Sequence, residues 1–344
     1  MTARYATDAE IQKWNTLIVA NPDGGNVFSS YEYLEQKRHT GYTPHYVIVD
    51  NIAVGILEKS TPPLGRFWYL PKGPGVTTVA QLHKTLEALK PLAIKRRAFM
   101  MRIESELSAK EEPLLKKRGL MKAAAIIPNA STITLDISPT LDDLLTSLPQ
   151  KGRHAIRRAE RDGVIIKRVD ATAKNCRTMY QLLTETAEGQ FGIRRYDYFK
   201  SYWQRFAQAG NGQLFFAYYD KKVVAGAFAM ILGEKSTYKD GASSRKRPAY
   251  GASHLLQWQV IQWAKENGAT IHDFCGSPPS AEINNTSHHH YGVGRFKLSF
   301  SRTVVDYIGC YDLVLNPPAH LLWRRGFERA YRHFYYKKTK DYYY

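Results

Sequence analysis

The chain has 344 residues, of which 44% are hydrophobic and 12% aromatic, and its formal net charge is +18. This length is enough for two domains with cores of their own, and the composition excludes a disordered chain. The positive excess favours a polyanionic partner such as nucleic acid, anionic lipid or a phosphorylated substrate, although an inert basic surface is the alternative.

Two absences in the sequence bear on the compartment. The three cysteines include no Cys-x-x-Cys pair, which argues against a disulfide framework and against zinc and is typical of a reducing cytosol. The opening MTARYATDAEIQKW has no apolar signal core, and no run of 18 uncharged apolar residues exists. We therefore expect a cytoplasmic protein, either free or held peripherally at the cytoplasmic face of a membrane.

Local signals predict alternating helices and strands in the first half of the chain. Thr7 and Asp8 precede a helical pattern as N-cap residues do, and Asp50 and Asn51 separate two apolar runs as a hairpin turn does. In chain order, the predicted elements are a helix from Thr7, a short helix from Ser29 or Ser30, strands 45–50, 52–57 and 66–70, a helix 79–92, a strand 98–103, a helix 111–118 and a strand 131–137.

The second half continues in the same way. Gly163 and Gly268 each follow a helical stretch, as helix-terminating glycines do. The predicted elements are helices 140–148 and 150–162, a strand 164–169, helices 175–188 and 196–209, strands 214–219 and 223–232, a helix 253–267, a strand 271–274, a strand 303–314 and a closing helix 319–336.

Two apolar hairpins indicate an internal repeat. YVIVDNIAVGIL and LFFAYYDKKVVAGAFAMIL both have an Asp at the turn and a Gly soon after it. One similar hairpin is weak evidence, because any hairpin alternates in this way. Both hairpins, however, lie in the same order of helix, helix, hairpin, helix and strand, which favours a duplicated α/β (α+β) unit.

The most specific motif lies within Ile271–Phe300. A short strand breaks at Gly276, a loop rich in Ser, Pro, Asn and His follows, and a Gly-rich turn leads to Phe296 and Lys297. A long loop inside a compact domain is usually functional or disordered, and an aromatic anchor beside a cation favours function. Asp-Phe-x-Gly followed by Gly-x-x-x-Phe-Lys-x-x-Phe resembles the C-terminal region of the Fem (FemABX) family of non-ribosomal peptidyltransferases.

This resemblance implies both an activity and a fold. Fem proteins move an amino acid from aminoacyl-tRNA onto the stem peptide of a peptidoglycan precursor, which builds interpeptide bridges in the cell wall. Their fold is two tandem acetyltransferase-like (GNAT) domains, with the end of the chain returning to the first domain. The absence of a coiled-coil insertion is FemX-like. We therefore expect a first domain at 1–148 plus 313–344 and a second at 149–312.

The resemblance also implies the partners. The expected donor is aminoacyl-tRNA, with no cofactor, and the expected acceptor is a lipid-linked or UDP-linked peptidoglycan precursor. A monomer is expected. Which amino acid is moved, and whether the accepting residue is lysine or diaminopimelate, stays open at this stage.

A basic helix carries the second match. LPQKGRHAIRRAERDGV follows the family pattern Pro-Ser/Gln-Lys-x-Arg-x-x-Ile-Arg/Lys-x-Ala. Positions 150, 153/154, 157 and 161 share one helix face, and a row of cations suits phosphates spaced along RNA. A solvated helix would show the same pattern. The residues expected to bind tRNA are Lys151, Arg153, Arg157, Arg158 and Arg161.

Two further motifs imply contacts with the precursor. In FGIRRYDYFKSYWQRF, Arg194 and Tyr198 match the family's Arg, three residues and Tyr-Phe, and Arg suits phosphate because it binds in a bidentate way. The alternative is a packed Tyr198 and a surface Arg194. In YKDGASSRKRPAYG, Tyr238 matches a substrate-binding position, whereas Asp240 stands where an aromatic is common. The cations at 245–247 either meet phosphate or form a solvated turn.

The remaining site residues follow from weaker matches. Glu104 lies in MRIESE, which resembles the family's Arg-Phe-Asp-Pro-Glu; it would take a proton or orient the acceptor amine, or be a plain surface residue. Lys37 matches a substrate-binding lysine, and Phe296 is expected to contact substrate. Lys297 is expected to stabilise the oxyanion that forms at the ester carbonyl; the alternative is that it only binds tRNA.

Other ligand classes are disfavoured. The adjacent His288, His289 and His290 cannot all face one ion, and no Cys/His partner has ligand spacing. The Gln/Arg-x-x-Gly-x-Gly/Ala turn of acyl-CoA acetyltransferases is absent from the sequence. The alternatives to a tRNA-dependent aminoacyltransferase are an acyl-CoA-dependent N-acyltransferase of the same fold and a non-catalytic basic RNA-binding protein.

Overall fold

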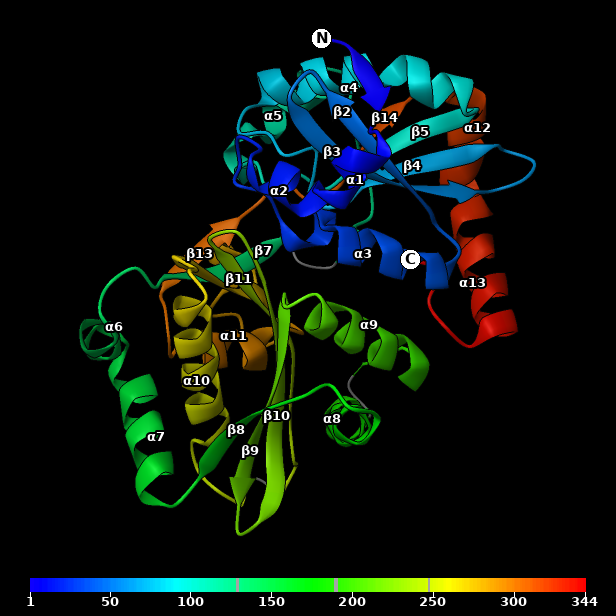
Figure 1. Cartoon of the computed structure of the whole chain (residues 1–344). Coiled ribbons are helices and arrows are strands. Elements are labelled where there is room, and N and C mark those ends of the chain that lie inside the picture. The colour runs from blue at the N-terminus through cyan, green and yellow to red at the C-terminus, as the bar shows by residue number, and fades with distance from the viewer. Residues whose placement is uncertain (128–129, 189–190, 247) are drawn as a thin grey trace. The chain divides into compact units, whose positions relative to one another are not determined.

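The computed structural model describes residues 1–127, 130–188, 191–246 and 248–344. The chain divides into two compact units (Figure 1), one of Met1–Ala130 with Asp306–Tyr344 and one of Ser131–Val305. Each unit contains a seven-stranded mixed sheet flanked by helices. The predicted α/β class is therefore confirmed.

The sheet of the first unit has one parallel pair. β4 and β5 run parallel because α4 (Val79–Lys95) crosses between them, whereas the other pairs in this sheet are antiparallel. In spatial order the strands are β1 (Ala3–Tyr5), β2 (Thr43–Val49), β3 (Ile52–Ser60), β4 (Arg66–Leu70), β5 (Ala98–Ile103), β14 (Tyr311–Val314) and β6 (Met121–Lys122).

The core of the first unit follows from helical and strand periodicity. Leu82, Leu86 and Leu89 of α4 are buried against Val54 and Ile56 of β3. The alternate residues of β3 face the other side, where helices α2 and α3 pack. The smaller elements of this unit are α1 (Asp8–Gln12), α2 (Trp14–Val19), η1 (Val27–Ser29), α3 (Tyr31–Gln36), η2 (Lys37–Thr40), η3 (Ala109–Glu111) and α5 (Glu112–Lys117).

The sheet of the second unit has the same plan. β11 and β12 run parallel and are joined by α10 (Ala252–Glu266), while β8–β9, β9–β10, β10–β11 and β7–β12 are antiparallel. In spatial order the strands are β13 (Thr303–Asp306), β7 (Ser131–Asp136), β12 (Ile271–Gly276), β11 (Lys235–Ser243), β10 (Lys222–Leu232), β9 (Gly212–Tyr219) and β8 (Ile165–Val169).

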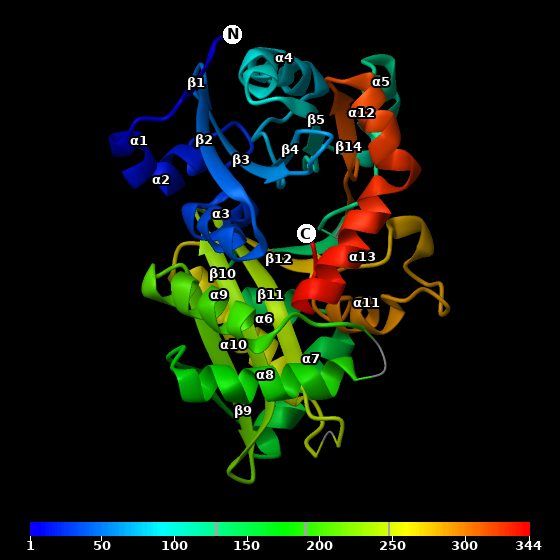
Figure 2. The same cartoon turned by 90° about the vertical axis from the view of Figure 1, so that its right-hand side faces the viewer.

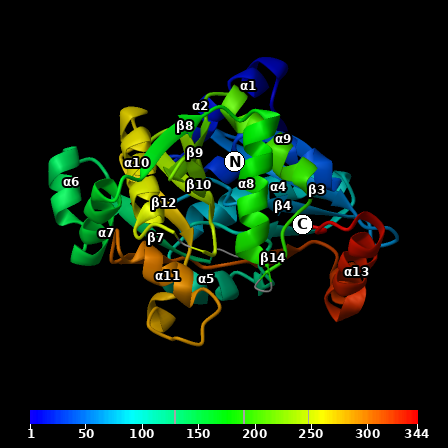
Figure 3. The same ribbon diagram turned by 90° about the horizontal axis from the view of Figure 1, so that it is seen from below.

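Helices cover both faces of this second sheet, as Figure 3 shows. α10 packs on one face, with Ala225 and Ala227 of β10 in its core cluster, and α7 (Gln150–Arg161) packs on α10. α8 (Ala173–Ala187) and α9 (Tyr196–Gln208) cover the face that carries Phe228. The remaining helices are α6 (Leu141–Ser147), η4 (Ser280–Glu282) and α11 (Tyr291–Lys297).

The order of elements repeats between the units, as the two hairpins indicated. β2-β3-β4-α4-β5 in the first unit corresponds to β9-β10-β11-α10-β12 in the second. In each sheet the strand after the crossover helix gains an antiparallel neighbour from a distant part of the sequence, β14 beside β5 and β7 beside β12.

Several elements differ from the expectations. β11 was not predicted, the expected Gly-rich turn before Phe296 and Lys297 is part of helix α11, and the single strand 303–314 is two strands in two different sheets. The units divide at Ala130/Ser131 and Val305/Asp306, whereas the sequence placed the limits at 148/149 and 312/313. The reason is that a strand's unit is set by its hydrogen-bonding neighbours, which local sequence does not reveal.

The closing segment belongs to the first unit and is bent (Figure 2). After β14 come α12 (Pro317–Leu322), η5 (Trp323–Phe327) and α13 (Glu328–Thr339), with non-helical torsion angles at Gly326. Trp323 is fully buried, with ring centroids 5.7 Å from Phe67 and 5.8 Å from Phe99. In the part of the chain that the structure describes, no helix combines the length and apolarity needed to cross a bilayer.

Candidate functional site

The parallel strands of the second unit separate at one point, which we call the β11–β12 fork, formed by Tyr238–Asp240 and Phe274–Gly276. β11 and β12 pair only from Lys235–Thr237 to Ile271–Asp273, although both strands continue. At the same level Lys239 is the extra residue of a β-bulge, because its two neighbours pair with successive residues of β10. Bulges redirect side chains and are frequent beside active sites.

Lys297 projects its ammonium into this fork. The side chain is only 5% exposed, and Nζ donates to the carbonyl oxygens of Cys275 (2.8 Å) and Gly276 (2.5 Å). Burial lowers the pKa of Lys297 to about 8, against the opposing effects of Cys275 and Asp273. Two of the three ammonium donors are thus used, and the third has no hydrogen-bond partner among the described residues. The predicted catalytic role of Lys297 stays a prediction.

The end of β12 is shaped to receive that ammonium. Cys275 has a positive φ of 58°, which is uncommon for a residue other than glycine. Its N–H donates to Oδ1 of Asp273 at 2.6 Å, and the hydroxyl of Thr132 donates to the same carboxylate oxygen. This local turn directs two successive carbonyls at Lys297, so the lysine and the strand end hold each other.

Phe296 anchors α11. Its ring lies 4.9 Å from His254 and 5.5 Å from Phe300, both edge to face, and packs on the apolar cluster around α10. This packing accounts for the aromatic residue in the motif. The expected contact of Phe296 with substrate stays a prediction.

Arg194 and Tyr198, predicted as a pair, lie together. The Arg194 guanidinium carbon is 4.6 Å from the centre of the Tyr198 ring, and the Tyr180 hydroxyl donates to the Arg194 carbonyl at 3.0 Å. The Tyr198 ring stacks on Tyr202 at 6.1 Å with 23° between the planes. Arg194 and Tyr198 are both half-buried, so each keeps part of its surface for a ligand.

Tyr238 and Asp240 flank the bulge. A Cβ on Gly241 would lie 1.7 Å from the Tyr238 hydroxyl oxygen, so glycine is required for this placement of the ring, and burial raises the pKa of Tyr238. Asp240 is 9% exposed and accepts hydrogen bonds from Trp203 Nε1 (2.9 Å) and Lys239 Nζ (3.0 Å). A buried carboxylate therefore orients Lys239.

The sequence motifs did not single out Lys239. Its neighbour Asp240 was the available signal, because an acidic residue at an aromatic position calls for a cationic partner. The bulge that redirects Lys239 depends on the pairing of β10 with β11, which the sequence does not show.

The basic helix α7 presents most of its predicted cations. Lys151, Arg157, Arg158 and Arg161 are exposed. Arg153 is different, because its guanidinium donates to the carbonyls of Thr146 (2.6 Å) and Leu148 and closes the end of α6. Arg153 is thus already engaged within the protein, and its expected contact with tRNA stays a prediction.

The other expected cations are partly engaged. Arg245 donates to the carbonyls of Glu185 (2.9 Å) and Glu188, which favours a structural turn at this position. Arg247 lies outside the described residues.

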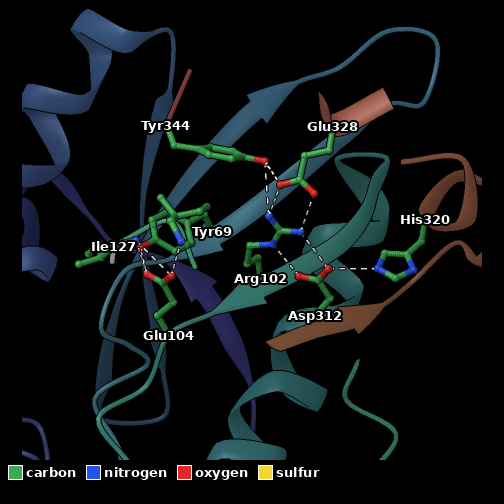
Figure 4. Close-up of polar contacts among 9 residues, drawn as sticks. Tyr69, Arg102, Glu104, Ile127, Asp312, His320, Glu328 and Tyr344 are labelled. Carbon is green, nitrogen blue, oxygen red and sulfur yellow. Dashed lines mark hydrogen bonds and ion pairs between the residues drawn. The ribbon is translucent and has the colours of Figure 1, made fainter. Parts of the chain in front are cut away.

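In the first unit, Glu104 is a buried structural hub (Figure 4), not a plain surface residue. The carboxylate accepts hydrogen bonds from the Tyr69 hydroxyl and from the backbone N–H groups of Ile126 and Ile127, the latter at 3.1 Å. Three donors to one carboxylate fix the chain at residues 126–127. Lys37 is buried on η2, with Nζ 5.2 Å from the Tyr33 ring. The proposed roles of Glu104 in catalysis and of Lys37 in binding stay predictions.

Beside Glu104, a buried ion network holds the closing segment (Figure 4). Arg102 is 1% exposed and donates to both carboxylate oxygens of Asp312, at 2.8 and 3.1 Å, and to Glu328 at 2.7 Å. His320 Nε2 lies 3.1 Å from Asp312, and Tyr344 donates to Glu328. The network ties β5 to β14, α12, α13 and the final residue.

Among the described residues, no group of three or more His, Cys, Asp or Glu side chains is placed so that it could hold a metal ion. The His288 and His290 rings lie 4.4 and 4.0 Å from His289, so the three rings cluster with one another. Cys176, Cys275 and Cys310 are free thiols.

Comparison with known proteins adds the evolutionary context. The acetyltransferase (GNAT) domain family matches residues 149–289. Among curated proteins, the Lipid II:glycine glycyltransferase of Staphylococcus aureus (strain MRSA252) is 23% identical over 399 aligned positions, which cover 90% of this chain and 93% of that protein.

Solved structures agree on the fold. The crystal structure of FemX matches with a TM-score of 0.81 at 20% identity, covering 95% of this chain and all of that one. The structure of L-PGS from Bacillus licheniformis matches with a TM-score of 0.55 at 14% identity over 94% of this chain and 97% of that one. The resemblance expected from the sequence motifs is therefore confirmed: the chain is similar to a curated glycyltransferase over most of its length and shares the fold of FemX.

Proposed function

We propose that the protein is an aminoacyltransferase that moves an amino acid from aminoacyl-tRNA to the stem peptide of a peptidoglycan precursor. The observation that carries this proposal is the buried Lys297 ammonium at the β11–β12 fork. It is supported by the similarity, over 90% of the chain, to a protein named for glycine transfer involving lipid II.

The chemistry required is acyl transfer from an ester. The neutral amine of the stem peptide attacks the ester carbonyl and forms the new C–N bond. The C–O bond to the tRNA ribose breaks, the amine loses a proton, and the ribose oxygen takes one up. Because the ester is already activated, the protein needs only to position both substrates and stabilise the negative oxygen of the intermediate. The third N–H of Lys297 is suited to that task.

Binding of the two substrates is assigned to different surfaces. The exposed cations of α7 suit the phosphates of tRNA. The Arg194 guanidinium, which lies over the Tyr198 ring, suits a phosphate of the precursor. Glu104 is proposed to act indirectly, by fixing residues 126–127, and Lys37 to bind the precursor from the first unit.

A peripheral place on an anionic membrane is also proposed, since a lipid-linked precursor lies there. The closing segment of α12, η5 and α13 exposes Leu321, Leu322, Phe334 and Tyr336 among the cations Arg324, Arg325, Arg329, Arg332, Lys337 and Lys338. Apolar side chains interspersed with cations are typical of helices that lie on anionic bilayers.

The test is a transfer assay with a mixed pool of charged tRNA and a purified peptidoglycan precursor, read by mass. The expected result is a precursor heavier by one or more amino acid residues, formed only when charged tRNA is present. Transfer of an acyl group from acyl-CoA alone would favour the acyl-CoA alternative. RNA binding without any product would favour the non-catalytic alternative.

A further inference from the structure

The mechanism proposed above does not use Lys239, the bulge residue of the fork. Its side chain is 28% exposed, and among the described residues its only hydrogen bond is to Asp240 Oδ1 at 3.0 Å. Asp240 cannot turn away, because Trp203 Nε1 holds its other oxygen. Lys239 is therefore an oriented cation with two N–H donors left for a ligand.

Lys239 stands in line with the predicted precursor residues. Its Nζ lies 5.6 Å from the centre of the Tyr202 ring, which stacks on Tyr198. The Arg194 guanidinium lies over the Tyr198 ring. Two stacked tyrosines thus separate two cations. Arg194 offers a planar guanidinium that suits phosphate. Lys239 offers a compact ammonium with one N–H already bound to Asp240.

Lys239 is positively charged at neutral pH, because its pKa is raised above the usual value for lysine. Burial lowers the pKa of Lys239, but the charge and hydrogen bond of Asp240 raise it more, so the net shift is upward. Tyr198 and Cys275 also raise this pKa.

Positive charge therefore dominates the groups that would face an arriving amine. Lys239 reaches the fork from strand β11 and Lys297 from helix α11, and Arg194 lies beyond the tyrosines. Of the carboxylates at the fork, Asp240 is bound by Trp203 and Lys239, and Asp273 accepts from Cys275 and Thr132. An acceptor that brings only an ammonium would be repelled, whereas one with a carboxylate next to its amine would compensate the cations.

We propose that Lys239 selects the acceptor by binding a carboxylate next to the accepting amine. The preferred third residue of the stem peptide then carries amine and carboxylate on the same carbon, as diaminopimelate does, and lysine is the disfavoured acceptor. This inference rests on the proposed aminoacyl transfer and specifies its acceptor class.

The test uses three UDP-linked precursors that differ only in the third residue of the peptide. This residue is meso-diaminopimelate, diaminopimelate with its side-chain carboxylate converted to an amide, or L-lysine. Calorimetric binding and kcat/KM with a mixed charged-tRNA pool are measured for each precursor. The full-length protein is compared with Lys239→Gln, which keeps a donor for Asp240 but removes the charge. Lys239→Arg restores the charge, and Lys222→Met is the control, since Lys222 is exposed on the neighbouring strand β10.

Wild-type protein should prefer diaminopimelate over both other residues by about 10- to 100-fold, the value of one hydrogen-bonded charge. Lys239→Gln should bring the three precursors to similar values, Lys239→Arg should recover part of the preference, and Lys222→Met should keep it. Equal use of the three precursors by wild type would overturn the proposal. So would an equal loss on all three in Lys239→Gln, which would mean that Lys239 reads the shared diphosphate or supports the fold. Selective binding without transfer would instead count against the proposed function and leave the carboxylate preference standing.

Discussion

At the scale of single residues, Lys297 shows how burial sets chemistry. An isolated ammonium in an apolar site would lose its proton, but two backbone carbonyls hold this one. The net effect is a Lys297 pKa of about 8. The ammonium is therefore mostly charged at neutral pH and loses its proton as the pH rises above about 8. The same carbonyls fix the direction of the remaining donor, which a surface lysine could not do.

A pH profile and a substitution test the catalytic role of Lys297. Because the ammonium must be charged to stabilise an oxyanion, kcat should fall as pH rises through about 8. Lys297→Met should lose about 100- to 1,000-fold in kcat at saturating charged tRNA. Turnover is measured from pH 6 to 10 at saturating concentrations of both substrates. A variant that regains the full rate at high tRNA would make Lys297 a binding residue.

At the scale of elements, α7 combines a packed face with a charged one. Gly152 faces inward, where a Cβ would lie 1.9 Å from the carbonyl oxygen of Ser299, so the helix meets the segment after α11 at backbone distance. Ala155, Ile156 and Ala159 complete the buried face. The exposed cations are therefore held rigidly by a helix that also packs close to Lys297.

We expect RNA binding by α7 to depend steeply on salt. Single-stranded RNA loses affinity with a log–log slope of about −0.7 per neutralised phosphate, so replacing Arg157, Arg158 and Arg161 by Gln should flatten the slope by roughly two. Arg153 is left in place because it closes α6. Binding is measured by fluorescence anisotropy across salt concentrations. A triple variant with the wild-type slope would remove α7 from the RNA site.

The closing helices have a divided surface. Trp323 is fully buried within the first unit, and the Tyr331 hydroxyl donates to the carbonyl of Pro62, while Phe334 is 67% exposed. One side of this segment therefore packs on the rest of its unit. The exposed side is the one proposed to lie on a bilayer.

Liposome flotation of the whole protein tests that exposed side. Binding should require anionic lipid and should weaken when Phe334 and Tyr336 are replaced by Ser, because apolar burial and cation attraction act together. Phe191, also exposed but in the second unit, supplies the matched control Phe191→Ser. Flotation that ignores lipid charge, or that survives the double replacement, would leave α13 with packing alone.

At the scale of the molecule, buried polar groups hold the fold of each unit together. In the first unit the Arg102 network secures the closing segment. In the second, His272 is fully buried between Ser236 Oγ and Gln257 Nε2, each at 2.7 Å. Such groups are stable only in one protonation state, so the stability of the chain depends on pH.

The second unit should lose stability in mild acid. Burial lowers the pKa of His272 from 6.5 to about 3. Between pH 3 and pH 6.5, His272 is therefore protonated in the unfolded chain but neutral in the folded chain. The free energy of unfolding should therefore fall as pH drops below 6.5, by about 2 kcal/mol at pH 5 for this residue. Urea unfolding at pH 7 and pH 5 measures it.

Two variants give this prediction its control. His272→Gln should be less stable at pH 7 but should show a smaller difference between the two pH values. His39→Gln, at an exposed position in the first unit, should leave the difference unchanged. If His272→Gln keeps the full acid loss, another group is responsible; His254, whose pKa burial and Lys151 lower to about 4, is the next candidate.

Local sequence determined the elements whose signal is periodic. The apolar spacing of α4, the two Asp-turn hairpins and the cation-rich α7 were all readable, because a helix face or a strand face repeats at a fixed interval. The motif around Phe296 and Lys297, the pair Arg194 and Tyr198, and the resemblance to Fem proteins followed from residue identities at fixed spacing.

Only the tertiary structure decided which side chains and strands contact segments distant in the sequence. The sequence did not distinguish Arg153 from the cations beside it, but the structure shows its carbonyl acceptors at α6. The sequence also left Glu104 either catalytic or a plain surface residue, but the structure encloses it between Tyr69 and residues 126–127. β11, the split of 303–314 between two sheets, and the bulge that directs Lys239 all depend on which strands pair. Strand pairing is a contact between segments far apart in the chain, and a local pattern of side chains carries no record of it.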